Sequence, residues 1–218
     1  PFANYWMHNG YINVDNKKMS KSLNNFFTVR DVAEKYGYEP IRFFLISSSY
    51  RSPINYNTDI IEQSVAALDR LYTCRQNLEF ALKNATEKSA EHDSGLFDAF
   101  EEHRNRFIEA MEDDLNTADA IAAVFELVRD INVAIAASPT LSVCKKALDI
   151  FNELTDVLGL LYERRQNGID EQIEAMIEQR TQARRQKNWA ESDRLRDELK
   201  DMGVVLEDTP QGVKWHRI

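Results

Sequence analysis

The sequence predicts a mainly α protein: an antiparallel helical bundle with a short β segment before it and a small α/β module after it. Only 7 glycines and 5 prolines occur among 218 residues, and 43% of the residues are hydrophobic, which is typical of a helix-rich globular chain. Long central segments repeat apolar residues at close to 3.6-residue spacing. Near the C-terminus, two short apolar runs flank a turn with proline and glycine, which indicates a hairpin.

The first thirty residues read as strands and tight turns. Residues 5–7 and 11–14 are rich in aromatic and β-branched side chains and are predicted to be short strands. The polar residues 15–17 form a turn, and a loop with two lysines follows it.

Two short helices are predicted next. Thr28 and Asp31 have the spacing of a capping box, which favours a helix from there to about Tyr36. Gly37 ends that helix, and a second helix is predicted over 39–46, with a proline in its first turn.

Four longer helices make the predicted bundle. In the first of them Ile61, Val65 and Leu68 recur on one face, and the other three repeat the pattern. Short connections imply antiparallel neighbours. The predicted segments are 58–84, 95–113, 117–137 and 141–161.

The end of the chain is predicted to form a helical pair followed by a hairpin, after a polar linker at 164–168. Gly203 is expected to stop the second helix. The helices are predicted at 170–187 and 189–202, the strands at 204–206 and 213–215, and the turn at 209–212.

Charge is distributed unevenly around the net value of −9. Residues 1–60 carry 7 basic and 5 acidic side chains, residues 61–179 carry 11 and 24, and residues 180–200 carry 7 and 4. Both basic regions could meet phosphates, whereas the acidic middle repels non-specific contacts. No apolar run of about 18 residues is present, so no membrane span is expected. A signal peptide is not expected either.

The cysteines and histidines do not suggest a metal site. Cys74 and Cys144 lie far apart in helical patterns, and the four histidines lack the spacing of metal ligands. We therefore expect buried thiols in a reducing cytosol and no metal.

The pentapeptide Lys18-Met19-Ser20-Lys21-Ser22 is the strongest functional motif. Lysines are compact charges on flexible stems, and two of them three positions apart can stabilise the charge on departing pyrophosphate. Lys18 and Lys21 are the candidate catalytic residues, with Lys21 expected to contact phosphate more directly, and Ser20 and Ser22 offer hydroxyl donors. Alternatively, the cluster is a solvated basic loop.

The pentapeptide is a hallmark of class I aminoacyl-tRNA synthetases, and the whole chain resembles the cysteinyl-tRNA synthetase family. In that family the usual sequence after the pentapeptide is Leu-Gly-Asn; Asn24 replaces the glycine here, and asparagine tolerates a left-handed backbone better than most residues. The matching segments are 5–10, 23–28, 50–53, 111–117 and 207–215.

The resemblance implies an enzyme that uses ATP, and by expectation Mg²⁺, to attach cysteine to tRNA(Cys) through a cysteinyl-adenylate. Residues 18–22 would bind ATP. The nucleotide-binding signature and the zinc ligands of the family would lie upstream of this chain, so we expect a C-terminal fragment that binds tRNA but does not catalyse. The intact enzyme would be cytoplasmic and monomeric.

The same resemblance assigns domains. Residues 1–27 would be the tail of the catalytic domain, 28–56 connecting helices, 57–165 a DALR-like bundle that docks tRNA, and 169–218 an anticodon-binding module.

Four residues of the last module match the anticodon-reading positions of the family. An exposed tryptophan beside arginines suits stacking on an unpaired base, and carboxylates can accept hydrogen bonds from base amino groups. Each also has a structural alternative: Trp189 as a packing aromatic, Asp193 as a partner of Arg196, and Asp208 as a turn residue. The four residues are Arg184, Trp189, Asp193 and Asp208.

Other polar residues stay open between two interpretations. Asn116 is better explained as a helix cap than as a functional residue. Asp113 and Asp114 suit a solvated helix end better than a metal site, and Arg42 and Arg51 fit either tRNA contacts or surface ion pairs.

Two rival functions remain. One is the related ligase that joins cysteine to a glucosamine-inositol in thiol biosynthesis, which has no need of an anticodon module. The other is a stand-alone RNA-binding module.

Overall fold

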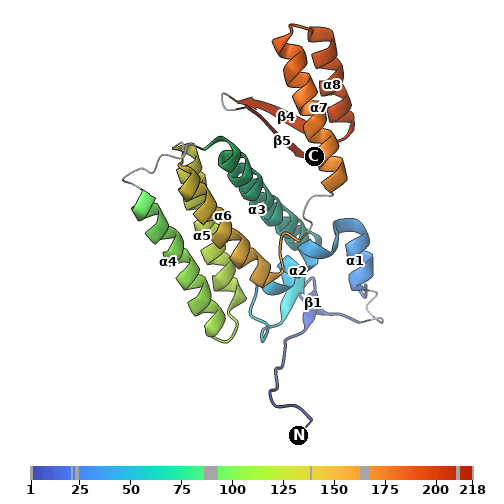
Figure 1. The fold of residues 1–218 in the computed structure, drawn as a ribbon. Coiled ribbons are helices and arrows are strands. Elements are labelled where there is room, and N and C mark those ends of the chain that lie inside the picture. Colours follow the sequence, from blue (N-terminus) through green and yellow to red (C-terminus); the bar gives the residue numbers. More distant parts are fainter. Residues whose placement is uncertain are drawn as a thin grey trace. The chain divides into compact units, whose positions relative to one another are not determined.

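The structure, a computed structural model, describes residues 2–20, 22, 25–85, 93–137, 139–162, 167–209 and 212–217. The chain forms two compact units, Pro1–Leu161 and Tyr162–Ile218. Helices dominate both units, and the mainly α prediction is confirmed (Figure 1).

A small sheet opens the larger unit. It consists of β1 (Ile12–Val14), β2 (Lys17–Lys18) and β3 (Ile54–Tyr56), in the order β2-β1-β3. β1 runs antiparallel to β2 and parallel to β3. The sequence did not predict β3, whose three side chains are only partly buried.

The predicted strand at residues 5–7 is wrong. These residues form no strand, and Tyr5, Trp6 and Met7 are 91%, 67% and 60% exposed. Aromatic composition favours a strand only where a neighbouring strand supplies hydrogen bonds, and none pairs with residues 5–7 in the described part of the chain.

Two short helices follow as predicted: α1 (Val29–Tyr36) and α2 (Tyr38–Ile46). Thr28 and Asp31 form the capping box, because the Thr28 hydroxyl accepts from the Asp31 N–H and the Asp31 carboxylate accepts from the Thr28 N–H. Gly37 joins the helices with φ of 81°, a conformation that favours glycine.

The bundle is formed by four helices that lie side by side, with consecutive helices in opposite directions (Figure 1). Their apolar faces meet in one core that includes Leu71, Phe100, Leu127 and Phe151, each no more than 1% exposed. The helices are α3 (Thr58–Asn84), α4 (Asp93–Glu112), α5 (Thr117–Ala136) and α6 (Leu141–Leu158).

Caps set the bundle boundaries. Asn116 caps α5 by accepting from the Asp119 N–H, so its predicted role as a helix cap is confirmed. Two boundaries differ from the prediction by more than one residue. α4 begins at Asp93, two residues early, and α6 stops at Leu158 because Gly159 takes the left-handed conformation that ends a helix.

Both cysteines are buried and free, as predicted. Burial raises the pKa of the Cys74 thiol to about 12 and also raises the pKa of Cys144. Neither thiol is therefore a reactive thiolate near neutral pH.

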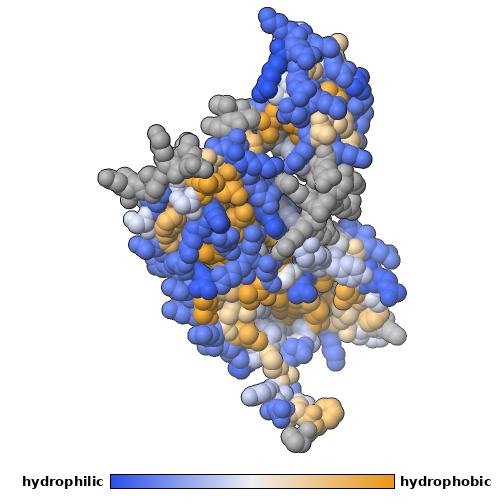
Figure 2. Space-filling model, viewed as in Figure 1, coloured by the Kyte–Doolittle hydropathy of each residue, from blue (hydrophilic) through white to orange (hydrophobic). Residues whose placement is uncertain are grey.

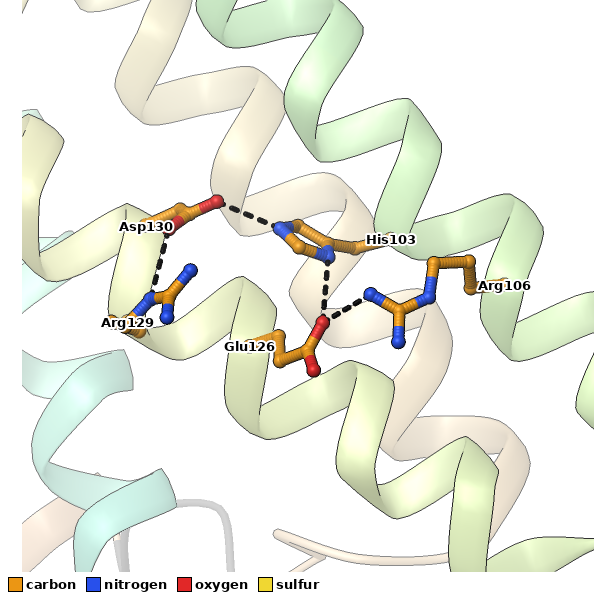
Figure 3. Close-up of polar contacts among 5 residues, drawn as sticks. All are labelled: His103, Arg106, Glu126, Arg129 and Asp130. Atoms are coloured by element: carbon orange, nitrogen blue, oxygen red, sulfur yellow. Dashed lines mark hydrogen bonds and ion pairs between the residues drawn. The ribbon is translucent and has the colours of Figure 1, made fainter.

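A buried histidine joins α4 to α5. Figure 3 shows His103 pointing from α4 towards Asp130 and Glu126 of α5. His103 is 7% exposed, and its Nε2 lies 2.8 Å from an Asp130 carboxylate oxygen. This hydrogen bond lowers the pKa of Asp130, while a hydrogen bond from Arg106 lowers the pKa of Glu126.

The smaller unit contains α7 (Asn167–Arg185), α8 (Trp189–Asp201), β4 (Val204–Thr209) and β5 (Gly212–Arg217). Ile173, Leu199 and Val204 form its buried core, and β4 pairs antiparallel with β5. The predicted hairpin is confirmed with longer strands. Residues 210 and 211, in its predicted turn, lie outside the described residues.

Replacing His103 by alanine should lower the free energy of unfolding by about 2 kcal/mol, because it removes a hydrogen bond to a charged group at a buried site. Arg129→Ala is the control: Arg129 touches the same Asp130 carboxylate but is 75% exposed, so we expect a loss below about 0.5 kcal/mol. The measurement is the reaction of Cys74 and Cys144 with a thiol reagent across a urea series, which reports unfolding of the larger unit. Equal losses in the two variants would contradict the role of burial.

Candidate nucleotide and nucleic-acid sites

The lysine motif begins in β2 and continues as a loop. Asp15 and Asn16 join β1 to β2 with φ of 49° and 60°, the left-handed geometry that suits two-residue hairpin turns. Lys18 pairs with Asn13 across the ladder, and its side chain is exposed. Lys21, the other predicted phosphate ligand, lies outside the described residues.

Asn25 closes this loop. Its Oδ1 accepts from the Ser20 N–H at 2.9 Å, and its Nδ2 donates to the Lys18 carbonyl at 3.3 Å. The hydroxyls of Ser20 and Ser22 lie 3.0 Å apart. The side chain of Asn25 thus holds the backbone at Lys18 and Ser20, where the loop starts. The side chain of Lys18 remains in solvent. Sequence reasoning gave Asn25 no role, because nothing in its spacing reveals these bonds.

The second candidate site lies in the smaller unit, where two arginines of α7 hold one carboxylate of β4. Arg180 donates to both Asp208 oxygens, from Nη1 to Oδ1 and from Nη2 to Oδ2, each at 3.0 Å. Arg184, one helical turn later, donates from Nη1 to Oδ2 at 2.7 Å. The structure therefore brings together the predicted pair Arg184 and Asp208, and it adds Arg180, which the sequence analysis missed.

The arginines keep Asp208 ionised. The hydrogen bonds from Arg180, opposed by partial burial and reinforced by Arg184, lower the pKa of Asp208 from 3.8 to about 2. Asp208 lies within β4, so its alternative interpretation as a turn residue is wrong.

The other two predicted base-reading residues lie on one face of α8. Trp189 is the first residue of the helix and is 58% exposed, so it does not pack as a core aromatic. Asp193 follows four positions later, and within the described part of the chain it has no hydrogen bond or ion pair, while Arg196 contacts Asp197 instead. Both side chains therefore remain available to a ligand.

Hydrophilic side chains cover most of α7 and α8 in the view of Figure 2. Within this unit the segment 180–200, which spans the end of α7 and most of α8, carries 7 basic and 4 acidic side chains and so has a positive balance. An exposed aromatic beside such charge is the combination that single-stranded nucleic acid requires.

Two other arginines of the larger unit make contacts within the chain. Arg51 forms an ion pair with Asp114 at 2.8 Å on the surface, where their side chains are 65% and 47% exposed, and Tyr50 donates to the same carboxylate. The guanidinium of Arg42 lies against Gly159, so close that a Cβ there would be 2.8 Å from its Nη1.

No cluster of three or more His, Cys, Asp or Glu side chains in the ranges given above could hold a metal ion. Among those same ranges, none of the helices combines the length and apolar character of a membrane span.

Three family models match the chain. They are the tRNA synthetases class I (C) catalytic domain over residues 1–66, the DALR domain over 106–162, and the cysteinyl-tRNA ligase anticodon binding domain over 166–215. The last match contains the arginine pair, Trp189 and both carboxylates.

Curated relatives include cysteine–tRNA ligases. That of Caldicellulosiruptor saccharolyticus is 50% identical over 220 residues, and that of Clostridioides difficile is 46% identical over 218 residues. Each alignment covers 100% of this chain but 47% of the relative, so the chain spans about half the length of these relatives.

The fold also resembles a solved structure, the ternary complex of Agrobacterium radiobacter K84 LeuRS, tRNA and LeuAMS. The TM-score is 0.54 at 21% identity, over 70% of this chain and 22% of that one. This likeness shows a shared fold.

Acid should break the contact between Asp208 and the arginines only well below the ordinary pKa of an aspartate. The pKa in the folded state, about 2, lies below 3.8, so the stabilisation is present above about pH 4 and is lost as the pH falls towards 2. The measurement is a pH titration of the ¹³C carboxyl signals in the aspartate-labelled chain. A midpoint for Asp208 near 3.8 would contradict the geometry described above.

Proposed function

Since this chain belongs to the cysteinyl-tRNA synthetase family, we propose that it is the C-terminal part of an enzyme that joins cysteine to tRNA(Cys) with ATP. The observation that most supports this proposal is the site of the smaller unit, with its arginine-held Asp208 and exposed Trp189. It lies within the region that matches an anticodon-binding domain.

We propose that the smaller unit reads the anticodon. Trp189, 58% exposed, would stack on an unpaired base, and the carboxylates of Asp193 and Asp208 would accept hydrogen bonds from base amino groups. Arg184, 43% exposed in its side chain, can reach the RNA from the edge of the cluster. The bundle, residues 57–165, would dock the body of the tRNA, with residues 28–56 connecting it to the catalytic region.

The lysine loop is proposed to act on ATP. The attack of the cysteine carboxylate on the α-phosphate gives cysteinyl-adenylate and pyrophosphate, and the cysteinyl group then passes to the terminal ribose of tRNA. Lys18 and Lys21 would stabilise the charge on pyrophosphate, with Met19, Ser20 and Ser22 completing the loop and Mg²⁺ assisting. The exposed side chain of Lys18 and the bonds of Asn25 at the start of the loop fit this role.

The same proposal covers the rest of the enzyme. Zinc and the surfaces that bind adenine and cysteine would belong to parts of the enzyme outside residues 1–218. A monomer in the cytoplasm is the expected state. The match to an anticodon-binding domain favours tRNA over the pseudo-disaccharide acceptor of the thiol-biosynthesis ligase.

Trp189→Ala should weaken binding of the tRNA(Cys) anticodon stem-loop about tenfold, because base stacking on an aromatic is worth about 1–3 kcal/mol. Arg184→Ala should weaken binding. It should also reduce the slope of log affinity against log salt concentration by about 1, the value of one phosphate contact. Fluorescence anisotropy at several salt concentrations gives both quantities.

The matched control is Arg194→Ala on α8. The Arg194 guanidinium is held by Glu191 and Glu198, so its loss should change affinity less than about threefold. If the Trp189 and Arg184 variants bind as well as the control, the site assignment is wrong.

The isolated 218-residue chain should show no cysteine-dependent exchange of pyrophosphate into ATP. The lysine loop stabilises a leaving group, but stabilising it is useful only where ATP and cysteine are both held in place. The exchange assay needs a positive control with a full-length cysteine–tRNA ligase. Clear exchange by this chain alone would overturn the proposal that the surfaces binding adenine and cysteine lie outside residues 1–218.

A further inference from the structure

The two arginines that hold Asp208 are not equivalent. The Arg180 side chain is 6% exposed and spans both carboxylate oxygens, whereas that of Arg184 is 43% exposed and reaches one. The Asp208 side chain itself is 46% exposed. One partner is thus part of the interior and the other belongs to the surface.

The hydrogen bonds of Arg180 fix the plane of the carboxylate. A planar guanidinium that makes two parallel bonds to one carboxylate sets its orientation as well as its charge. Arg180 is buried, so its side chain has little freedom to turn away from Asp208. Its Nε has no hydrogen-bond partner among the described residues. Its two Nη–carboxylate bonds are therefore what compensates for burying the guanidinium.

We infer that Arg180 is a positioning residue for base recognition: it holds Asp208 in a reading orientation and keeps that carboxylate paired when Arg184 turns towards the RNA. The inference rests on the proposed function, in which Asp208 contacts an anticodon base.

The number of hydrogen bonds supports this division. Among the described residues, Oδ2 of Asp208 accepts from both arginines and Oδ1 accepts only from Arg180. A carboxylate oxygen has two lone pairs, so the departure of Arg184 leaves each oxygen with one bond from Arg180 and one lone pair for a donor on a base. Without Arg180, the same movement would leave a rotating carboxylate with no fixed direction.

The experiment measures binding of this chain to the tRNA(Cys) anticodon stem-loop and to versions with each anticodon base replaced in turn. Arg180→Met should reduce the preference for the matched base about tenfold, the value of one charge-assisted contact, at a single anticodon position. Asp208→Ala should lose its preference at that same position. Arg180→Lys, which keeps the charge but not the bidentate geometry, should fall between Arg180→Met and the wild type.

The double variant separates positioning from direct contact. If Arg180 acts through Asp208, then Arg180→Met in the Asp208→Ala background causes no further loss of preference. Arg185→Met is the charge-matched control on the same helix; it should weaken binding to all the RNAs alike. Arg180→Met should also move the ¹³C carboxyl titration of Asp208 upwards, a readout that needs no RNA. A circular dichroism spectrum that matches the wild type shows separately that the variant is folded.

The outcomes are distinguishable. A wild-type chain that shows no preference for the matched anticodon refutes the proposed function itself. A wild-type preference that survives unchanged in both Arg180→Met and Arg180→Lys overturns the positioning role alone. Additive losses in the double variant overturn it as well, because they would mean that Arg180 contacts the RNA independently.

Discussion

The larger unit depends on the burial of one helix, α5. Leu127 and Ile131 of this helix are fully buried, and the same core contains residues of α3, α4 and α6. Burying a side chain of this size contributes about 1.5–3 kcal/mol. Because the apolar stripe of α5 fixes where its neighbours lie, most acidic side chains of the bundle are left to the surface, where they cost little. Asp93 of α4 is an exception: it is 7% exposed and accepts from the Thr140 hydroxyl.

Buried hydrogen bonds attach α2 to the helical bundle. Glu39 of α2 is 4% exposed, and it accepts from the Tyr72 hydroxyl of α3 and from the Leu161 N–H that follows α6. A buried carboxylate needs such partners, so α2 cannot shift without breaking them.

In the smaller unit, a small apolar core is combined with one ion pair between a helix and a strand. Its buried core is small, and the double contact between Arg180 and Asp208 joins α7 to β4. The same contact that stabilises the unit therefore also orients a candidate recognition group. A carboxylate held by a buried guanidinium is oriented before any ligand arrives, which reduces the entropy lost on binding.

The sequence by itself determined the helices, their caps, the lysine motif and the family resemblance, because each is written in local spacing. Thr28 with Asp31 and Asn116 with Asp119 needed only the adjacent residues. Local spacing failed where a distant partner decides the outcome: residues 5–7 lacked a neighbouring strand, and β3 exists because β1 lies beside it. The pairing of Arg180 with Asp208, 28 positions apart, was likewise decided by the packing of β4 against α7, since only tertiary structure brings a buried guanidinium to a carboxylate.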